Sequence, residues 1–317
     1  MAANPGIAAR YRAFSCSDRA VAAHGPGIGD WSCGFAVRWA VVATLSLMAA
    51  GCAAAPLERS GSLASYDNLT PSDGLLTKSQ VSISKADVLG AKTLRIEPAA
   101  FTVAAAREPF SDKQRDLIKN AINRAMCFTL SERFRIVAAT EAADLSVRAV
   151  ITHIAPTDAT AAGVSKVASV VPSIVAPGVP IPVPRLPIGL GSLSVEAEAR
   201  DPSGNQKAAM IWARGANSFT SAPRVSSDGD AYDLARAFGD DFGKLLVTAE
   251  SPFGKVSAPS IDSLKASLGG APKQAICEVF GRAPGLPGMV GERIGMPPDW
   301  TDQGASSNAA SEAPVTD

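Results

Sequence analysis

An uncharged apolar segment that ends at a cysteine divides this chain into two parts. Residues 39–51 carry no charged side chain and follow directly after Arg38. This segment is shorter than the roughly 20 residues that a helix needs to cross a bilayer. A basic residue, an apolar centre and a small-residue end are instead typical of a secretory signal. We therefore expect the folded part of the protein to begin after residue 51.

The end of this segment, Ala49, Ala50, Gly51 and Cys52, resembles the lipobox of bacterial lipoproteins, although that motif usually begins with Leu. The resemblance implies cleavage between Gly51 and Cys52 and a diacylglycerol on Cys52, which would act as a membrane anchor. Ala53 follows, whereas Asp there would indicate retention in the inner membrane by analogy with lipoprotein sorting. We expect a Gram-negative outer-membrane lipoprotein that faces the periplasm. The alternative is a buried helix that happens to end in cysteine.

The depth of this signal in the chain suggests that translation begins near residue 37, at Val37, if its codon is GTG. The sequence then divides into an upstream extension and signal peptide (1–51), a flexible lipid-attached tether (52–65), a periplasmic globular domain (66–281) and a disordered tail (282–317). The tether and the tail are rich in Ala, Gly, Ser and Pro. Such composition favours a loose chain.

The balance of charges excludes one class of partner. The chain has 30 basic and 30 acidic residues among 317, and 46% of its residues are hydrophobic. This apolar content is enough for one sizeable core. A nucleic-acid-binding surface requires a basic excess, so we expect no nucleic-acid partner.

Two long helices and several strands are predicted. Ser111 with Gln114 forms a capping box at the start of the first helix, whose apolar positions form one face: Leu117, Ile118, Ala121, Ile122, Ala125 and Met126. The second helix begins near Asp230, as its cap, and ends near Thr248, with an apolar stripe of Leu234, Ala235, Phe238, Phe242, Leu245 and Leu246. Its Gly239 and Gly243 are expected to allow close packing against a neighbour.

The strands are predicted at residues 93–96, 134–139 and 144–154, and in a hairpin around Asp201 to Gly204, which has turn chemistry. Leu193, Val195, Ala197 and Ala199 alternate with Glu196, Glu198 and Arg200 in the first hairpin strand. The order of elements predicts an α+β (or α/β) fold, a single compact domain with a mixed or antiparallel sheet, a β-hairpin and two main helices.

Cys127 and Cys277 are the cysteines that remain after Cys52. An oxidising periplasm favours a disulfide between them. Two separate buried thiols are the alternative.

The other candidate residues favour structural roles. His153 ends an apolar strand without a nucleophile motif beside it. Asp228, Asp230 and Asp233 lack the spacing of a calcium loop, so a helix start explains them better. Neither they nor the two distant cysteines form a recognisable metal site. We expect no catalytic residue, no metal and no cofactor.

Glu196 and Glu198 resemble a glycosidase pair only in chemistry, and an exposed strand face explains them better. The glycines of "GLPGMVG" (285–291) are expected in a loop rather than at a phosphate.

The stretch from 163 to 192 is apolar, and six prolines lie between Pro172 and Pro187. Proline excludes it from a sheet interior or a regular helix. It either covers the edge of the core or serves as an interaction loop that binds an envelope protein or dips into a membrane surface.

Several stretches of this chain together resemble an uncharacterised family of Gram-negative lipoproteins, the domain of unknown function 3313. They are "SYDNLTPSDGLL", "AADLSVRAVITHIAPT", "RLPIGLGSLSVEAEARDPSG" with "WARGA", and "GDAYDLARAFGDDFG". The resemblance spans about residues 60–250 and implies export and a single domain, with no assigned catalytic residue. The expected function is a membrane-anchored binding, envelope-assembly or transport-accessory role. The alternative is a periplasmic hydrolase that uses His153.

Overall fold

The structure is a computed structural model that describes residues 55–165, 188–218, 220–221, 223–254, 269–282, 284–302 and 304. These residues all fall in one unit, residues 47–317. Residues 1–54, 166–187 and 305–317 lie outside the described part, and with them the signal segment, Gly51, Cys52 and most of the loop at 163–192.

Eight strands of the described chain form one mixed sheet. Their order across the sheet is β1 (Thr70–Pro71), β2 (Lys78–Ile83), β8 (Gln206–Gly215), β7 (Ser192–Arg200), β6 (Leu145–Ala155), β3 (Thr93–Ile96) and β5 (Arg135–Ile136), with β4 (Ala100–Phe101) on β6. The pairs β3–β5, β3–β6 and β4–β6 are parallel, and the other pairs are antiparallel. The predicted α+β fold with a mixed sheet is therefore confirmed.

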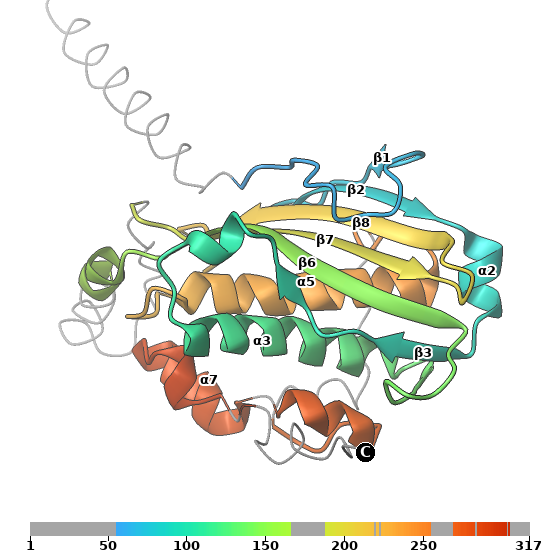
Figure 1. The fold of residues 1–317 in the computed structure, drawn as a ribbon. Helices are drawn as coiled ribbons and strands as arrows, with labels where there is room; N and C mark the ends of the chain where they lie inside the picture. The colour runs from blue at the N-terminus through green and yellow to red at the C-terminus, as the bar shows by residue number, and fades with distance from the viewer. Residues whose placement is uncertain are drawn as a thin grey trace, which may run out of the picture. The chain divides into compact units, whose positions relative to one another are not determined.

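Two long helices cover one face of this sheet (Figure 1). They are α3 (Asp112–Leu130) and α5 (Gly229–Thr248). The predicted capping box of Ser111 and Gln114 is present, and all twelve apolar positions predicted for the two helices are buried. Shorter helices are α2 (Lys85–Gly90), η1 (Ala105–Arg107), η2 (Ala275–Phe280), α7 (Gly285–Ile294) and η3 (Pro298–Trp300).

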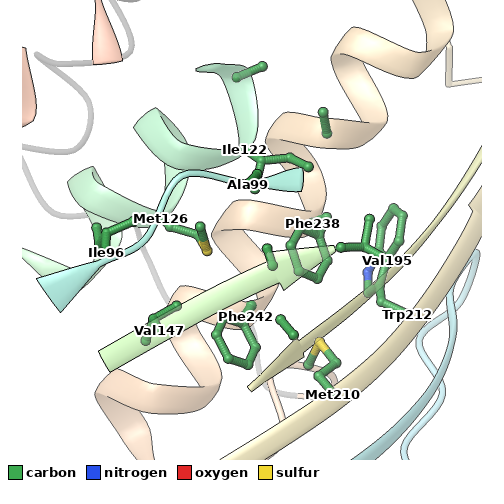
Figure 2. Close-up of a cluster of buried hydrophobic side chains, with 14 of the residues drawn as sticks. Ile96, Ala99, Ile122, Met126, Val147, Val195, Met210, Trp212, Phe238 and Phe242 are labelled. Atoms are coloured by element: carbon green, nitrogen blue, oxygen red, sulfur yellow. The ribbon is translucent and has the colours of Figure 1, made fainter. Parts of the chain in front are cut away.

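The core fills the space between the sheet and the two helices. Figure 2 shows Trp212 of β8, Val195 of β7 and Met126 of α3 in this layer, together with Phe238 and Phe242 of α5. The two phenylalanine rings are stacked, with centroids 6.0 Å apart. The odd-numbered residues of β7, from Leu193 to Ala199, point into this core, as the alternation predicts.

The glycines of α5 explain how closely the two helices approach. A Cβ atom on Gly239 would lie 2.6 Å from the Ala125 Cβ and 2.8 Å from the Ile122 carbonyl oxygen. A Cβ atom on Gly243 would lie 2.6 Å from the Thr129 Cβ. Both positions therefore require glycine, because α3 occupies the space that a side chain would need. The close packing expected from the sequence is confirmed.

One half-buried carboxyl group of α5 makes the stability depend on pH. Asp241 accepts a hydrogen bond from the Trp212 indole N–H at 3.0 Å, and burial raises its pKa from 3.8 to about 6. The neutral carboxyl therefore makes its full contribution to the free energy of unfolding below pH 3.8. This contribution is lost as the pH rises through about 6.

We expect Asp241→Asn to raise the free energy of unfolding at pH 8 by about 1–2 kcal/mol, because it removes a partly buried charge and keeps an acceptor oxygen for Trp212. Urea unfolding at pH 8 and pH 4 measures the effect. A gain of the same size at pH 4 would contradict this account, since the wild-type carboxyl is mostly neutral there.

Two predicted boundaries are wrong. Residues 56–65 were expected in a flexible tether, yet Leu63 is buried against Ala209 and Ile211 of β8. Residues 284–302 were expected in a disordered tail, yet they form α7 and η3. In both segments specific tertiary contacts, such as those of Leu63 with β8 and of Glu292 with Arg224, order a chain whose composition favours a loose one.

Candidate functional site

The outer face of the sheet, opposite the two helices, carries a polar site under the N-terminal segment. We call residues 56–66 the strap. The strap crosses β7 and β8, and its Leu63 contacts Ala209 and Ile211. Ile211 and Ala209 pair in register with Glu196 and Glu198 of β7, so all four side chains share this face.

Glu196 binds the strap through four hydrogen bonds. Its carboxylate accepts from the Ser60 amide at 2.8 Å, the Ser60 hydroxyl at 2.7 Å, the Ser62 amide at 3.0 Å and the Tyr66 hydroxyl at 2.7 Å. The Glu196 side chain is fully buried. Burial, together with the hydrogen bond to Glu196, raises the pKa of Tyr66, so the phenol stays a donor at neutral pH.

Glu198 has a different set of partners. It accepts from the Ala64 amide at 2.8 Å and forms ion pairs with Arg148, at 3.1 Å, and with Arg200. Arg148 also donates to the Ser62 carbonyl. The two carboxylates are thus occupied by donors from the chain itself, and neither is free to act on a substrate.

The expectation that Glu196 and Glu198 lie on an exposed strand face is therefore wrong. The alternation of β7 correctly places them opposite the core, but the strap covers them. The partners in the strap were missed because they lie 130 or more positions away in the sequence. The sequence signal that could have indicated a covered site is the pair of glutamates on one face of β7, opposite small and apolar residues of β8.

The first contact of the strap lies close to the predicted lipid cysteine. The Ser194 hydroxyl, on the same strand face, donates to the Pro56 carbonyl at 2.7 Å. Pro56 lies four positions after Cys52, which corresponds to at most about 14 Å of extended chain. Any group on Cys52 would therefore stay near the end of the sheet where β7 begins.

We expect Glu196→Gln to release the strap, because its NH2 group cannot accept a hydrogen bond. In one orientation the Ser60 amide loses its acceptor, and in the other the Ser62 amide and the Ser60 and Tyr66 hydroxyls do. The free energy of unfolding should fall by about 2–3 kcal/mol. Trypsin should then cleave after Arg59, within the strap, faster than in the wild type, as N-terminal sequencing of the digest would show. The exposed Glu141→Gln is the matched control. Equal cleavage rates in all three proteins would refute the role of Glu196.

His153 lies at a bulge of β6 and hydrogen-bonds Ser192. The ring Nε2 and the Ser192 hydroxyl are 3.1 Å apart, and burial lowers the pKa of His153. Ser192 is only 2% exposed. In the described part of the chain, no carboxylate is bonded to the other ring nitrogen. The pair therefore lacks both the access and the third group of a hydrolytic triad.

The three aspartates near the start of α5 bind three different partners. Asp228 accepts from the Gln114 amide at 3.2 Å, Asp230 from the Gly191 amide at 2.8 Å, and Asp233 from Arg224 at 3.1 Å. The cap residue is Asp228 rather than the predicted Asp230, which lies inside the first turn and fixes the start of β7 instead. The structure does not bring the three carboxylates together at a calcium site.

The C-terminal segment is fastened to α3 by a disulfide and a buried ion pair. Cys127 and Cys277, both fully buried, are bonded to each other, and their Cα atoms are 5.7 Å apart. Arg124 of α3 donates to Asp302 at 2.5 Å, and Tyr232 of α5 donates to the same carboxylate. The disulfide pairing is the one considered from the sequence, whereas the contact with Asp302 was missed.

The described residues offer neither a metal site nor a membrane span. They contain no group of three or more His, Cys, Asp or Glu side chains arranged to hold a metal ion. They also include no helix with the length and apolar character that a membrane span requires.

A family model describes much of this chain. The model, described as "Protein of unknown function (DUF3313)", matches residues 58–242, which is more than half of the chain. The chain belongs to this family. The match includes the strap from Glu58 onward, the whole sheet and most of α5, so the site on the outer face lies within the DUF3313 domain. The segment that carries Cys277 and α7 lies beyond it.

Comparison with other proteins adds little. No curated protein matches this DUF3313 chain. Among solved structures, a PelC dodecamer from Paraburkholderia phytofirmans aligns with 54% of this chain and 97% of its own, at 10% identity and a TM-score of 0.31. A substituted form of that dodecamer aligns with 52% of this chain and 95% of its own, at 10% identity and a TM-score of 0.29. Similarity at this level carries no functional argument.

Proposed function

We propose that this protein is a lipoprotein of the Gram-negative outer membrane, anchored by a lipid on Cys52, with its domain in the periplasm. Its role is to bind a partner in envelope assembly or transport rather than to catalyse a reaction. The lipobox-like end of the uncharged segment supports the anchor. Anchor and role go beyond the family membership, because the family is uncharacterised.

The observation that carries this proposal is the position of the strap relative to Cys52. The chain is fixed to the sheet at Pro56, and Glu196 and Glu198 bind Ser60, Ser62 and Ala64 within the next eight residues. A lipid on Cys52 would then hold the domain against the bilayer, with almost no free tether between them. The strap would thus connect the anchor directly to the sheet.

The disulfide supports the proposed compartment. Cys127 and Cys277 form a fully buried bond between two segments 150 residues apart. Stable disulfides form in oxidising compartments, including the bacterial periplasm, and are rare in the cytosol.

Intact mass analysis of the protein purified from envelopes tests the anchor. We expect the chain to begin at Cys52 and to carry a diacylglycerol and an amide-linked acyl group. Cys52→Ser should accumulate as a precursor without lipid. A mature chain with an unmodified Cys52 would overturn the proposal. Separation of inner and outer membranes on a density gradient tests the outer-membrane location.

The partner-binding role is tested on the proline-rich loop. Replacing residues 172–187 by a Gly-Ser linker should leave the folded domain intact and abolish crosslinks to envelope proteins in living cells. If the replaced protein unfolds, the loop covers the core instead. The prolines in this segment prevent it from joining the sheet. The segment is therefore expected either to bind a partner or to cover the core.

The hydrolase alternative rests on His153 and Ser192. The pair lies at hydrogen-bonding distance, but Ser192 is buried. Should an activity be found, His153→Ala should abolish it if the pair is catalytic and leave it unchanged if the pair is structural.

A further inference from the structure

Helix α7 exposes every one of its described large apolar side chains. Leu286 is 64% exposed, Met289 45%, Val290 59% and Ile294 56%. Their spacing of three, four and eight residues places them on one face of the helix, which we call the outer face of α7. The opposite side carries Gly288 and Gly291, which contact Pro284 and Thr301. Among its described residues, α7 thus contributes no large apolar side chain to the core.

This helix is nevertheless fixed to the domain on several sides. Arg224, which is buried, pairs with Glu292 of α7 at 3.2 Å, and the Val225 amide donates to the Gly295 carbonyl at 2.9 Å. The Cys277 disulfide precedes the helix and the buried Asp302 follows it. The outer face is therefore held in a defined position, which a frayed chain end would not be.

A chain of contacts connects α7 with the end of the sheet where the strap begins. The Gly295 carbonyl accepts a hydrogen bond from the Val225 amide. Two residues after Val225, the Ser227 carbonyl accepts from the amide of Thr157, which lies just after the end of β6. Asp230 binds Gly191, just before β7. Ser194 of β7 then binds Pro56 of the strap. The C-terminal end of α7 and the attachment of the strap thus lie at the same end of the domain.

We propose that the outer face of α7 rests in the interfacial layer of the bilayer that carries the lipid on Cys52. This inference rests on the proposed anchor, because Cys52 lies within about 14 Å of chain from Pro56. An amphipathic helix with an apolar face binds in this layer. Trp300, which is 70% exposed, follows α7 and is a residue type enriched there.

A second copy of the chain fits this face less well. A stable dimer buries about 800 Å² per partner, and four side chains on a ten-residue helix offer only part of that area. A bilayer sets no such minimum, because the lipid on Cys52 already supplies the attachment.

The test uses the lipidated protein in phosphatidylethanolamine and phosphatidylglycerol vesicles. In the mature chain, Cys127 and Cys277 are bonded to each other and Cys52 carries the lipid, so Val290→Cys introduces a single reactive thiol for an environment-sensitive NBD label. Leu89→Cys, on α2 at the opposite end of the sheet, is the matched control, since Leu89 is 51% exposed. Leu286→Cys provides a second position on α7.

We expect the label at positions 290 and 286 to shift its emission to the blue and to be quenched by spin-labelled lipids, and the label at position 89 to do neither. Emission at 290 and 286 that matches position 89 would overturn the proposal. A blue shift without quenching would also overturn it, because a protein surface would then cover α7. Intact mass reports separately on the lipid, so a missing anchor is distinguished from an α7 that does not touch the bilayer.

Discussion

Asp302→Ala should lower the free energy of unfolding by about 3–5 kcal/mol, one of the two largest effects expected for this protein. The Asp302 carboxylate is 1% exposed and the Arg124 side chain is 3% exposed. Removing the carboxylate leaves the guanidinium of Arg124 buried without its counter-charge. The hydroxyl of Tyr232 loses the same acceptor. Urea unfolding followed by circular dichroism measures the loss.

Two controls separate the buried charge from the loss of contact. The nearby Asp299 forms an exposed ion pair with Lys113 at 3.1 Å, and Asp299→Ala should cost no more than about 1 kcal/mol. The double variant Arg124→Met with Asp302→Leu should recover much of the stability, because an apolar pair can replace a buried ion pair. A similar small loss for Asp299→Ala and Asp302→Ala would contradict this account.

Removing the disulfide should lower the free energy of unfolding by about 2–5 kcal/mol. The bond closes a loop of 150 residues in the unfolded chain, and loops of this length lose much conformational entropy when they are cross-linked. The variant with Cys127→Ala and Cys277→Ala should unfold at lower urea than the oxidised wild type.

Reduction provides the internal control for this prediction. Dithiothreitol should shift the wild-type unfolding midpoint toward that of the double variant and leave the variant unchanged. If the reduced and oxidised wild-type proteins unfold at the same urea concentration, the bond contributes nothing to stability. If the reagent also shifts the variant, the effect of reduction is not due to this bond.

The sequence predicts the central layers of this fold well because their signals are local. The capping box of Ser111 and Gln114, the apolar stripe of α3 and the alternation of β7 each appear within about twenty residues. Helical and strand periodicity report directly on which face meets the core between the sheet and the helices. The need for glycine at 239 and 243 also follows, because α5 is otherwise apolar on that side.

The contacts at the two ends of the domain could not be predicted in the same way. Glu196 binds Ser60 across 136 positions, and Arg124 binds Asp302 across 178 positions. No periodic pattern records such pairs. The composition of the strap and of α7 even predicts disorder, because glycine and serine lower local propensity. In both segments, tertiary contacts override that local preference.

The strap also sets an order of events during the maturation of the protein. The strap leaves the ribosome well before β7, since Tyr66 precedes its acceptor Glu196 by 130 residues. Until β7 has emerged, the amides of Ser60, Ser62 and Ala64 have no carboxylate to bind. If the chain is processed at Cys52, as we propose, the processing enzyme meets a strap that its carboxylate partners do not yet hold. Once Glu196 and Glu198 bind the strap, its residues 60–66 become part of the folded surface, so we expect processing to be faster before the domain folds than after.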